Sequence, residues 1–368
     1  MTKKILPVLI LSFCLCYGWD NITNLSIEKG ERIIVFAPHP DDEILGCAGL
    51  IQKIIKNEGD VHIVYLTNGD HNQIPYRIHE KKIILKPSDY IKLGEIRRKE
   101  SMRATDILGV PNEKLIFLGY PDFGCLRIWE EFWNENENPF MSFLTKARYV
   151  PYQENYSFGK PYISESILSD IKNIIERIKP SKIFITASFD TNTDHRALYN
   201  FVRAATMGIK DIKPEIFNYI IHFKYYPQKN SEFLTLPDIP SISKIYNVSL
   251  DSEELSKKKA ALTCFRSQTI LKKNWFSSFA RKNEIYYKET DESIDENRIL
   301  ALESEKEAEF KNYRNLSFPF YCALKKEGEF LNIAFNQRNK IELATEYIFY
   351  FFPYKKDVEF SAMPKLTV

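Results

Sequence analysis

The sequence lacks an excess of either charge and has no basic block. Its 368 residues include 51 lysines and arginines against 49 aspartates and glutamates, a formal net charge of +2. No cluster of basic residues interleaved with aromatic residues occurs, so the sequence does not indicate binding to nucleic acid. Internal repeats and low-complexity tracts are also absent, and the length allows one large domain or two.

Cysteine is scarce, and its spacing excludes the common zinc and redox motifs. Four of the six cysteines lie beyond the N-terminal segment, at Cys47, Cys125, Cys264 and Cys322. Their spacing matches neither a zinc knuckle nor a redox pair, and Cys47 is expected to be a small buried residue. A disulfide among the others stays open for a chain that matures in an oxidising compartment.

Long apolar runs are absent after the first eighteen residues. Lys3 and Lys4 precede an apolar run from Ile5 to Tyr17, which is too short to span a bilayer comfortably. Residues 1–18 are therefore predicted to be an export signal, with an uncleaved N-terminal anchor as the alternative. We expect an exported chain that is periplasmic, secreted or anchored to the membrane by this segment.

A dense polar cluster follows the first clear strand. Residues 33–43 read Ile-Ile-Val-Phe-Ala-Pro-His-Pro-Asp-Asp-Glu, so an apolar run of strand length leads into one imidazole and three carboxylates. Apolar residues at helical spacing continue to Ile55, and Gly59 offers a stop. This order of strand, elbow and helix places His39 and the acids at the carboxyl end of a strand. Open α/β sheets bind their ligands at that edge.

The residue types of this elbow suit a divalent cation. His39 and Asp42 offer a neutral nitrogen and an anionic oxygen within one tight turn, and zinc and similar ions accept both. Asp41 and Asp42 would disfavour each other's ionisation as bare neighbours, and a bound cation removes that cost. Asp41, pointing elsewhere, would then be free to take a proton from a water activated by the ion. The alternative is that the acids only complement the dipole of a helix N-terminus at the surface.

A second polar cluster follows another predicted strand. The strand at residues 182–187 is followed by Asp-Thr-Asn-Thr-Asp-His at residues 190–195 and by a predicted helix over residues 195–208. Because both clusters lie at the carboxyl ends of parallel strands, we expect them to converge. His195 would complete a His, Asp, His set that leaves coordination positions open for water and substrate, as a catalytic metal requires.

The first cluster resembles the signature of a known enzyme family. Ala-Pro-His-Pro-Asp-Asp-Glu at residues 37–43, followed by Leu45-Gly46-Cys47 and Gly49, is similar to the motif of the PIG-L/LmbE-like deacetylases. These are zinc-dependent N-acetylglucosaminyl deacetylases with a Rossmann-like fold. The resemblance implies that His39 and Asp42 are metal ligands and that Asp41 is the general base. Five separate motifs in the family's order extend it over roughly residues 31–288.

Other motifs of this resemblance imply further site residues. Arg97, in an Arg-x-x-Glu helix, would reach substrate or brace the site, with an exposed ion pair as the alternative. Asp122, in a Gly-Tyr-Pro-Asp turn, is expected to bind sugar hydroxyls rather than metal. The family usually has His-x-Asp-His at the second cluster, so His195 matches a metal ligand there. Asp194 matches an acid that orients a neighbouring imidazole or braces the site.

Asn192 departs from the family pattern, because it stands where a polarising histidine normally lies. Asparagine can donate a hydrogen bond to an oxyanion, but it cannot hold or deliver a proton near neutral pH. Three outcomes stay open: Asn192 stabilises the oxyanion alone, another group protonates the leaving amine, or activity is reduced. His222, in a predicted strand over residues 216–223, is either the replacement proton donor or an ordinary core residue.

The remaining pattern predicts an α/β fold, Rossmann-like, with a mostly parallel sheet flanked by helices and a small C-terminal β appendage. The aromatic stretch over residues 126–163 would either contact sugar rings or cover the core. Further strands are predicted at residues 61–67 and 115–120, and further helices at residues 93–109, 164–179 and 251–266. The predicted domains are the export segment 1–18, a deacetylase-like domain at 30–288, a charged linker at 289–314 and a β-rich appendage at 315–368.

These features together predict a hydrolase that removes the acetyl group from an N-acetylated amino sugar. Asp41 is the expected general base, and Zn²⁺, or another divalent metal such as Fe²⁺, is the expected cofactor. The expected partner is a small-molecule or glycan substrate, with membrane proximity only through the N-terminal segment, and the oligomeric state stays open. Two alternatives remain: a glycan-binding protein on a relict deacetylase scaffold, and an amide hydrolase for a different acylated glycoconjugate.

Overall fold

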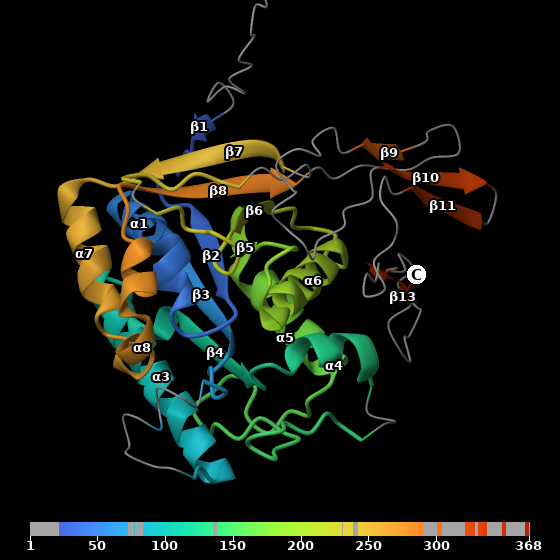
Figure 1. The fold of residues 1–368 in the computed structure, drawn as a ribbon, viewed down its shortest axis with the longest axis horizontal. Helices are drawn as coiled ribbons and strands as arrows, with labels where there is room; N and C mark the ends of the chain where they lie inside the picture. The colour runs from blue at the N-terminus through green and yellow to red at the C-terminus, as the bar shows by residue number, and fades with distance from the viewer. Residues whose placement is uncertain are drawn as a thin grey trace, which may run out of the picture.

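A computed structural model describes most of the chain between residues 22 and 289 (Figure 1). The described residues are 22–72, 77, 84–134, 138–229, 231–237 and 242–289, together with five short strands between residues 300 and 367. The predicted export segment at residues 1–18 lies outside them. None of the helices that the structure describes is long and apolar enough to cross a membrane.

One eight-stranded sheet forms the centre of the fold. Its strands lie in the order β1-β7-β8-β6-β5-β2-β3-β4, and all neighbours run parallel except where β8 pairs with β6 and β7. This confirms the predicted α/β fold with a mostly parallel sheet. The strands are β1 (Ile22–Asn24), β2 (Arg32–Ala37), β3 (Asp60–Thr67), β4 (Leu115–Tyr120), β5 (Lys182–Thr186), β6 (Glu215–Tyr219), β7 (Ile242–Ser249) and β8 (Asn283–Glu289).

Helices cover both faces of this sheet and bury one apolar cluster on each (Figure 1). The helix α5 (Ser164–Ile178) shows why the sequence folds this way, because its isoleucines recur every three or four residues and all are buried. One face carries α1 (Asp42–Lys56), α3 (Pro87–Ile107), α7 (Ser252–Leu262) and α8 (Arg266–Ser278). The other carries α4 (Cys125–Glu131), α5 (Ser164–Ile178) and α6 (Thr193–Met207).

The strand order reverses direction between β2 and β5. From β2 the chain passes through α1 to β3 and β4 on one side, and it then returns to β5 and β6 on the other side. Loops that leave two adjacent strands in opposite directions leave a crevice between them, and α/β proteins bind ligands there. The two polar clusters of the sequence follow β2 and β5, so both lie at this switch point.

The structure also contains elements that the sequence patterns missed. These are β1, β7, β8, α4 and α8, and the helix predicted from residue 93 begins earlier, at Pro87. Much of the predicted linker lies outside the described residues, although β9 (Leu300–Glu303) falls within it. Farther along, β10 (Tyr321–Glu327) pairs antiparallel with β9 and with β11 (Phe330–Asn336), and β12 (Ile348–Tyr350) with β13 (Lys365–Thr367). The division into domains stays a prediction.

The aromatic residues of the stretch 126–163 mostly cover the core. Trp129, Trp133 and Tyr152 are buried in the cluster beneath α4, α5 and α6, while Tyr149 and Tyr156 are exposed. The indole of Trp129 packs edge-on against Trp133, with 5.3 Å between the ring centroids. For the buried members, the core alternative of the sequence analysis therefore holds.

Candidate active site

The first elbow turns sharply between β2 and α1. Asp41 has a φ of +138°, a backbone conformation that residues with a side chain rarely adopt, and it occupies the N-cap position of α1, which begins at Asp42. The backbone N–H of Asp41 donates to Glu43 at 2.9 Å, and Ser101 donates to the other oxygen of Glu43 at 2.8 Å. This turn directs Asp42 and Asp41 to different partners. Strain of this kind is typical of functional turns.

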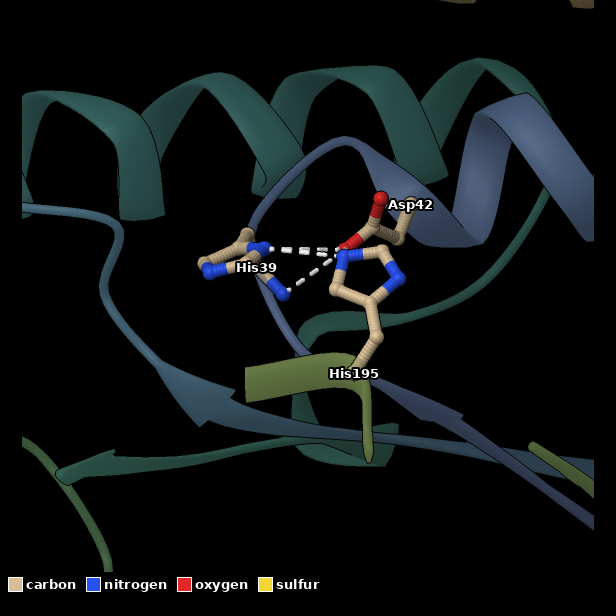
Figure 2. A group of neighbouring side chains, drawn as sticks. All are labelled: His39, Asp42 and His195. Atoms are coloured by element: carbon tan, nitrogen blue, oxygen red, sulfur yellow. Dashed lines mark hydrogen bonds and ion pairs between the residues drawn. The ribbon is translucent and has the colours of Figure 1, made fainter. Parts of the chain in front are cut away.

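Three side chains from the two clusters meet at one point (Figure 2). The Oδ2 atom of Asp42 lies 3.2 Å from Nδ1 of His39 and 3.2 Å from Nε2 of His195. The two ring nitrogens lie 3.3 Å from each other. The predicted convergence of the two clusters is therefore present in the fold, and all three residues are buried.

This triangle of atoms fits a tetrahedral metal. Zinc bonds of about 2.0–2.2 Å at tetrahedral angles place neighbouring ligand atoms roughly 3.3–3.6 Å apart. The outer nitrogens of both imidazoles face carboxylates, since Nδ1 of His195 lies 3.0 Å from Asp190 and Nε2 of His39 lies 3.2 Å from Asp194. If those nitrogens carry the protons, Nδ1 of His39 and Nε2 of His195 present lone pairs toward the Asp42 carboxylate. Three converging lone pairs suit a cation.

The electrostatics of the cluster also favour a positive charge. Burial lowers the pKa of His39, but the carboxylates of Asp122, Asp194 and Asp42 outweigh it and hold the pKa well above its ordinary value. Burial likewise lowers the pKa of His195, yet Asp190 and Asp42 raise it to about 9. In a chain without metal these imidazoles attract protons for the same reason that they would attract a metal ion.

Asp190 is a site residue that the sequence analysis did not single out. One of its oxygens accepts from the backbone N–H of Asn192 at 2.9 Å, and the other faces His195 and accepts from the N–H of His222 at 3.0 Å. Asp190 thereby holds the ring of His195 in place and connects the second cluster to the loop after β6 through its hydrogen bond from His222. Carboxylates behind metal-binding imidazoles commonly hold the tautomer and the ring orientation.

Asp194 has a comparable position behind His39. Its carboxylate accepts from the backbone N–H groups of Phe123 at 2.6 Å and Cys125 at 3.1 Å, and it faces Nε2 of His39. Asp122 lies on the same side, with Oδ1 3.2 Å from Nε2 of His39 and Oδ2 accepting from the N–H of His71 at 2.9 Å. Both acids thus contact the outer nitrogen of His39. The predicted sugar contact of Asp122 stays a prediction.

Asp41 is held by Arg97. The Nη2 atom of Arg97 donates to Oδ2 of Asp41 at 2.9 Å and to the carbonyl of Pro40 at 2.9 Å, while Nη1 donates to the carbonyl of Gly69 at 2.8 Å. Burial raises the pKa of Asp41 to about 7, although Arg97 opposes this. Gly69 has a φ of +68°, and a Cβ there would lie 2.0 Å from Nη1. Arg97 is buried, so it is not the exposed ion pair of the alternative, and its predicted role toward substrate or as a brace of the site stays a prediction.

Asn192 and His222 lie beside the centre in different ways. The Oδ1 atom of Asn192 caps α6 by accepting the N–H of Asp194 at 2.9 Å, so only its Nδ2 group is left for the predicted oxyanion contact. The ring of His222 lies 4.9 Å from that of His195 and stacks on Trp275, with 5.2 Å between centroids and 3° between planes. Burial and the neighbouring His195 lower the pKa of His222 to about 4.

The fold and this cluster define an α/β protein with a His, Asp, His centre at the switch point of its sheet. Residues 34–206 match the PIG-L family, described as GlcNAc-PI de-N-acetylase. This range contains every candidate site residue predicted above except His222. This match confirms the resemblance over residues 34–206.

Individual relatives are distant. A glucosamine-6-phosphate deaminase-like protein of Bacteroides thetaiotaomicron is 23% identical over 193 residues, which cover 48% of this chain and 27% of that protein. The chain therefore spans only about a quarter of the length of that relative.

The solved structures that the chain resembles are also distant in sequence. Teicoplanin deacetylase Orf2, in a zinc-inhibited form, is 16% identical, with a TM-score of 0.47 over 71% of this chain and 100% of its own. N,N'-diacetylchitobiose deacetylase from Pyrococcus horikoshii is 19% identical, with a TM-score of 0.41 over 70% of this chain and 82% of its own. The 4-carboxy-2-hydroxymuconate hydratase GalB from Pseudomonas putida is 15% identical, with a TM-score of 0.42 over 68% and 82%.

Proposed function

We propose that this chain is a metal-dependent amide hydrolase that removes the acetyl group from an N-acetylated amino sugar. The observation that carries the proposal is the triangle of His39 Nδ1, Asp42 Oδ2 and His195 Nε2, with sides of 3.2–3.3 Å, inside the residues that match the PIG-L family. Three protein ligands leave a tetrahedral ion one open position, which is typical of catalytic rather than structural metals.

His39, Asp42 and His195 would hold Zn²⁺, or another divalent ion such as Fe²⁺. Such an ion supplies a Lewis acid that activates water and polarises the amide carbonyl. Asp190 and Asp194 hold the two imidazoles with their outer nitrogens protonated, which keeps the inner nitrogens available as ligands. The carboxylates at both outer nitrogens, Asp190 for His195 and Asp194 with Asp122 for His39, support this division of roles.

Asp41 would act as the general base. It lies next to a proposed ligand but bonds to Arg97, and its side chain retains 11% exposure, so a water can reach it. Asp41 takes a proton from the attacking water, and the oxygen of that water bonds to the acetyl carbon. The carbon–nitrogen bond then breaks, and the proton passes to the departing amine, giving acetate and a free amino sugar. In this scheme Asp41 holds the proton between the two steps, because Asn192 cannot hold one near neutral pH.

Substitution of Asp41 separates metal binding from catalysis. Asp41→Asn is expected to keep the metal and to lower amine release by about a hundredfold or more, because the general base is lost. His39→Ala and His195→Ala are expected to lose the metal itself. Metal content is measured by elemental analysis, and amine release is measured on N-acetylglucosamine and its oligomers.

Asp106→Asn provides the matched control, since Asp106 is an exposed acid on α3. It should retain both metal and activity. Wild-type turnover in Asp41→Asn would refute the assignment of the base. A metal-loaded wild type that binds these sugars and releases no amine would instead support the glycan-binding alternative.

A further inference from the structure

An exposed aromatic side chain in a strained conformation follows the site residue Asp122. Phe123 is 55% exposed and has a φ of +59°. This left-handed region favours glycine, and a bulky residue there is an outlier. Strained residues at functional sites often serve a ligand rather than the fold.

The backbone conformation has a structural purpose. It turns the N–H groups of Phe123 and Cys125 toward the carboxylate of Asp194, at 2.6 and 3.1 Å. Successive N–H groups arranged in this way form an anion-binding nest, and here the anion is the acid behind His39. A glycine at position 123 would build the same nest without strain. The nest therefore explains the turn and does not explain the phenyl ring.

The ring is not explained by core packing either. More than half of the side chain is exposed, whereas Trp129, a few residues later on α4, is fully buried. The ring of Phe123 lies against that of His71, at 4.7 Å between centroids and 50° between planes. The backbone of His71 is in turn bonded to Asp122. Two aromatic rings thus lie together beside an acid that contacts His39.

We propose that Phe123 and His71 form an aromatic platform that packs against the C–H face of the pyranose ring of the substrate. This inference rests on the proposed function and names a subsite for it. The face of an aromatic ring carries partial negative charge and attracts polarised C–H bonds. A sugar ring offers such a face, while its hydroxyls stay at the edge to form hydrogen bonds. Phe123 follows Asp122 in the chain and the backbone N–H of His71 donates to Asp122, so both rings are anchored to an acid that contacts His39.

The effect of Phe123 on substrate binding tests the platform. In the metal-loaded enzyme, Phe123→Ala is expected to raise KM for di-N-acetylchitobiose about tenfold with little change in kcat, because the ring contacts sugar and not the reacting amide. Phe123→Tyr should restore KM, and Phe123→Gly should raise KM as alanine does while relieving the backbone strain. N-methylacetamide, which has no sugar ring, should show no dependence on Phe123.

Phe158→Ala is the matched control. Phe158 is 53% exposed and lies two residues after Tyr156, which lines a groove with Leu115 at the amino end of β4, away from the centre. This variant should leave KM unchanged. An unchanged KM in Phe123→Ala, with activity intact, overturns the platform and leaves the proposed function standing.

A second measurement separates the two proposals and the two possible occupants. Calorimetric titration with N-acetylglucosamine measures Kd without turnover, so a Phe123-dependent Kd in a protein that releases no amine supports the platform and refutes the hydrolase. A wild type that neither binds nor cleaves the sugar refutes both. A series of N-acyl glucosamines with longer acyl chains is the last arm. If the loss of affinity caused by Phe123→Ala grows with the length of the acyl chain, the rings hold the acyl group, and this result overturns the sugar assignment.

Discussion

Removal of the carboxylate behind His195 should weaken metal binding without removing a ligand. Asp190→Asn is expected to reduce the affinity for Zn²⁺ by about 10–100-fold, the usual effect of losing an outer-shell partner, or roughly 1.4–2.7 kcal/mol. The structure explains why asparagine cannot replace this residue. Both oxygens of Asp190 face N–H donors, with Asn192 on one side and His195 and His222 on the other. Either orientation of the amide would turn its NH₂ group against a donor.

The assay is a competition between the metal-free protein and a chromophoric chelator, with folding checked by circular dichroism. Asp170→Asn is the matched control, because Asp170 is a buried carboxylate on α5 that binds Tyr120 and Ser157 instead of a candidate ligand. Both variants lose a buried acid, so both should lose some stability, and only Asp190→Asn should lose metal affinity. Equal zinc affinity in the wild type and a folded Asp190→Asn protein would refute the role of Asp190.

Two further predictions concern stability. Lys258→Ala should lower the free energy of unfolding by about 3–5 kcal/mol, because Glu284 would stay buried and charged beneath α1 without its ion-pair partner at 2.7 Å. A loss below about 1 kcal/mol in urea unfolding would contradict this. Burial raises the pKa of Asp70 to about 7. Between about pH 4 and 7 the folded chain therefore keeps a proton that the unfolded chain has lost. The free energy of unfolding falls by up to about 4 kcal/mol as the pH rises through this range. Asp70→Asn should remove this slope, so its stability relative to the wild type should rise from pH 4.5 to 7.5, and a pH-independent difference would count against a protonated Asp70.

The local parts of the site could be predicted from sequence because their signals are local. The apolar run of β2, the elbow and α1 are contiguous, and the same holds for β5 and α6. Parallel strands end at one edge, so two polar clusters after such strands are expected to meet there. The proposed ligand set of His39, Asp42 and His195 follows from these two facts and from the residue types, and the structure brings those three side chains together.

The partners of those side chains could not be predicted, because they depend on packing between distant segments. Asp194 reaches His39 across 155 positions, and the nest that orients it comes from the turn after β4. The stacking of His222 on Trp275 joins the loop after β6 to α8, a helix whose pattern was too weak to predict. Asn192 had a local signal, since it precedes a helix and is a preferred N-cap. The N-cap of α6 is the role that the structure shows for it.

The excess of acid around the centre follows from where the centre lies. Both α1 and α6 begin at this edge, and a helix N-terminus presents positive partial charge that normally attracts anions such as phosphate. A cation can bind at the same edge only where carboxylates outweigh both dipoles. In the described part of the chain the cation Arg97 is opposed there by five aspartates, Asp41, Asp42, Asp122, Asp190 and Asp194. This balance leaves negative charge that a divalent ion would neutralise in part. The chain thus converts an edge that usually binds phosphate into one suited to a metal.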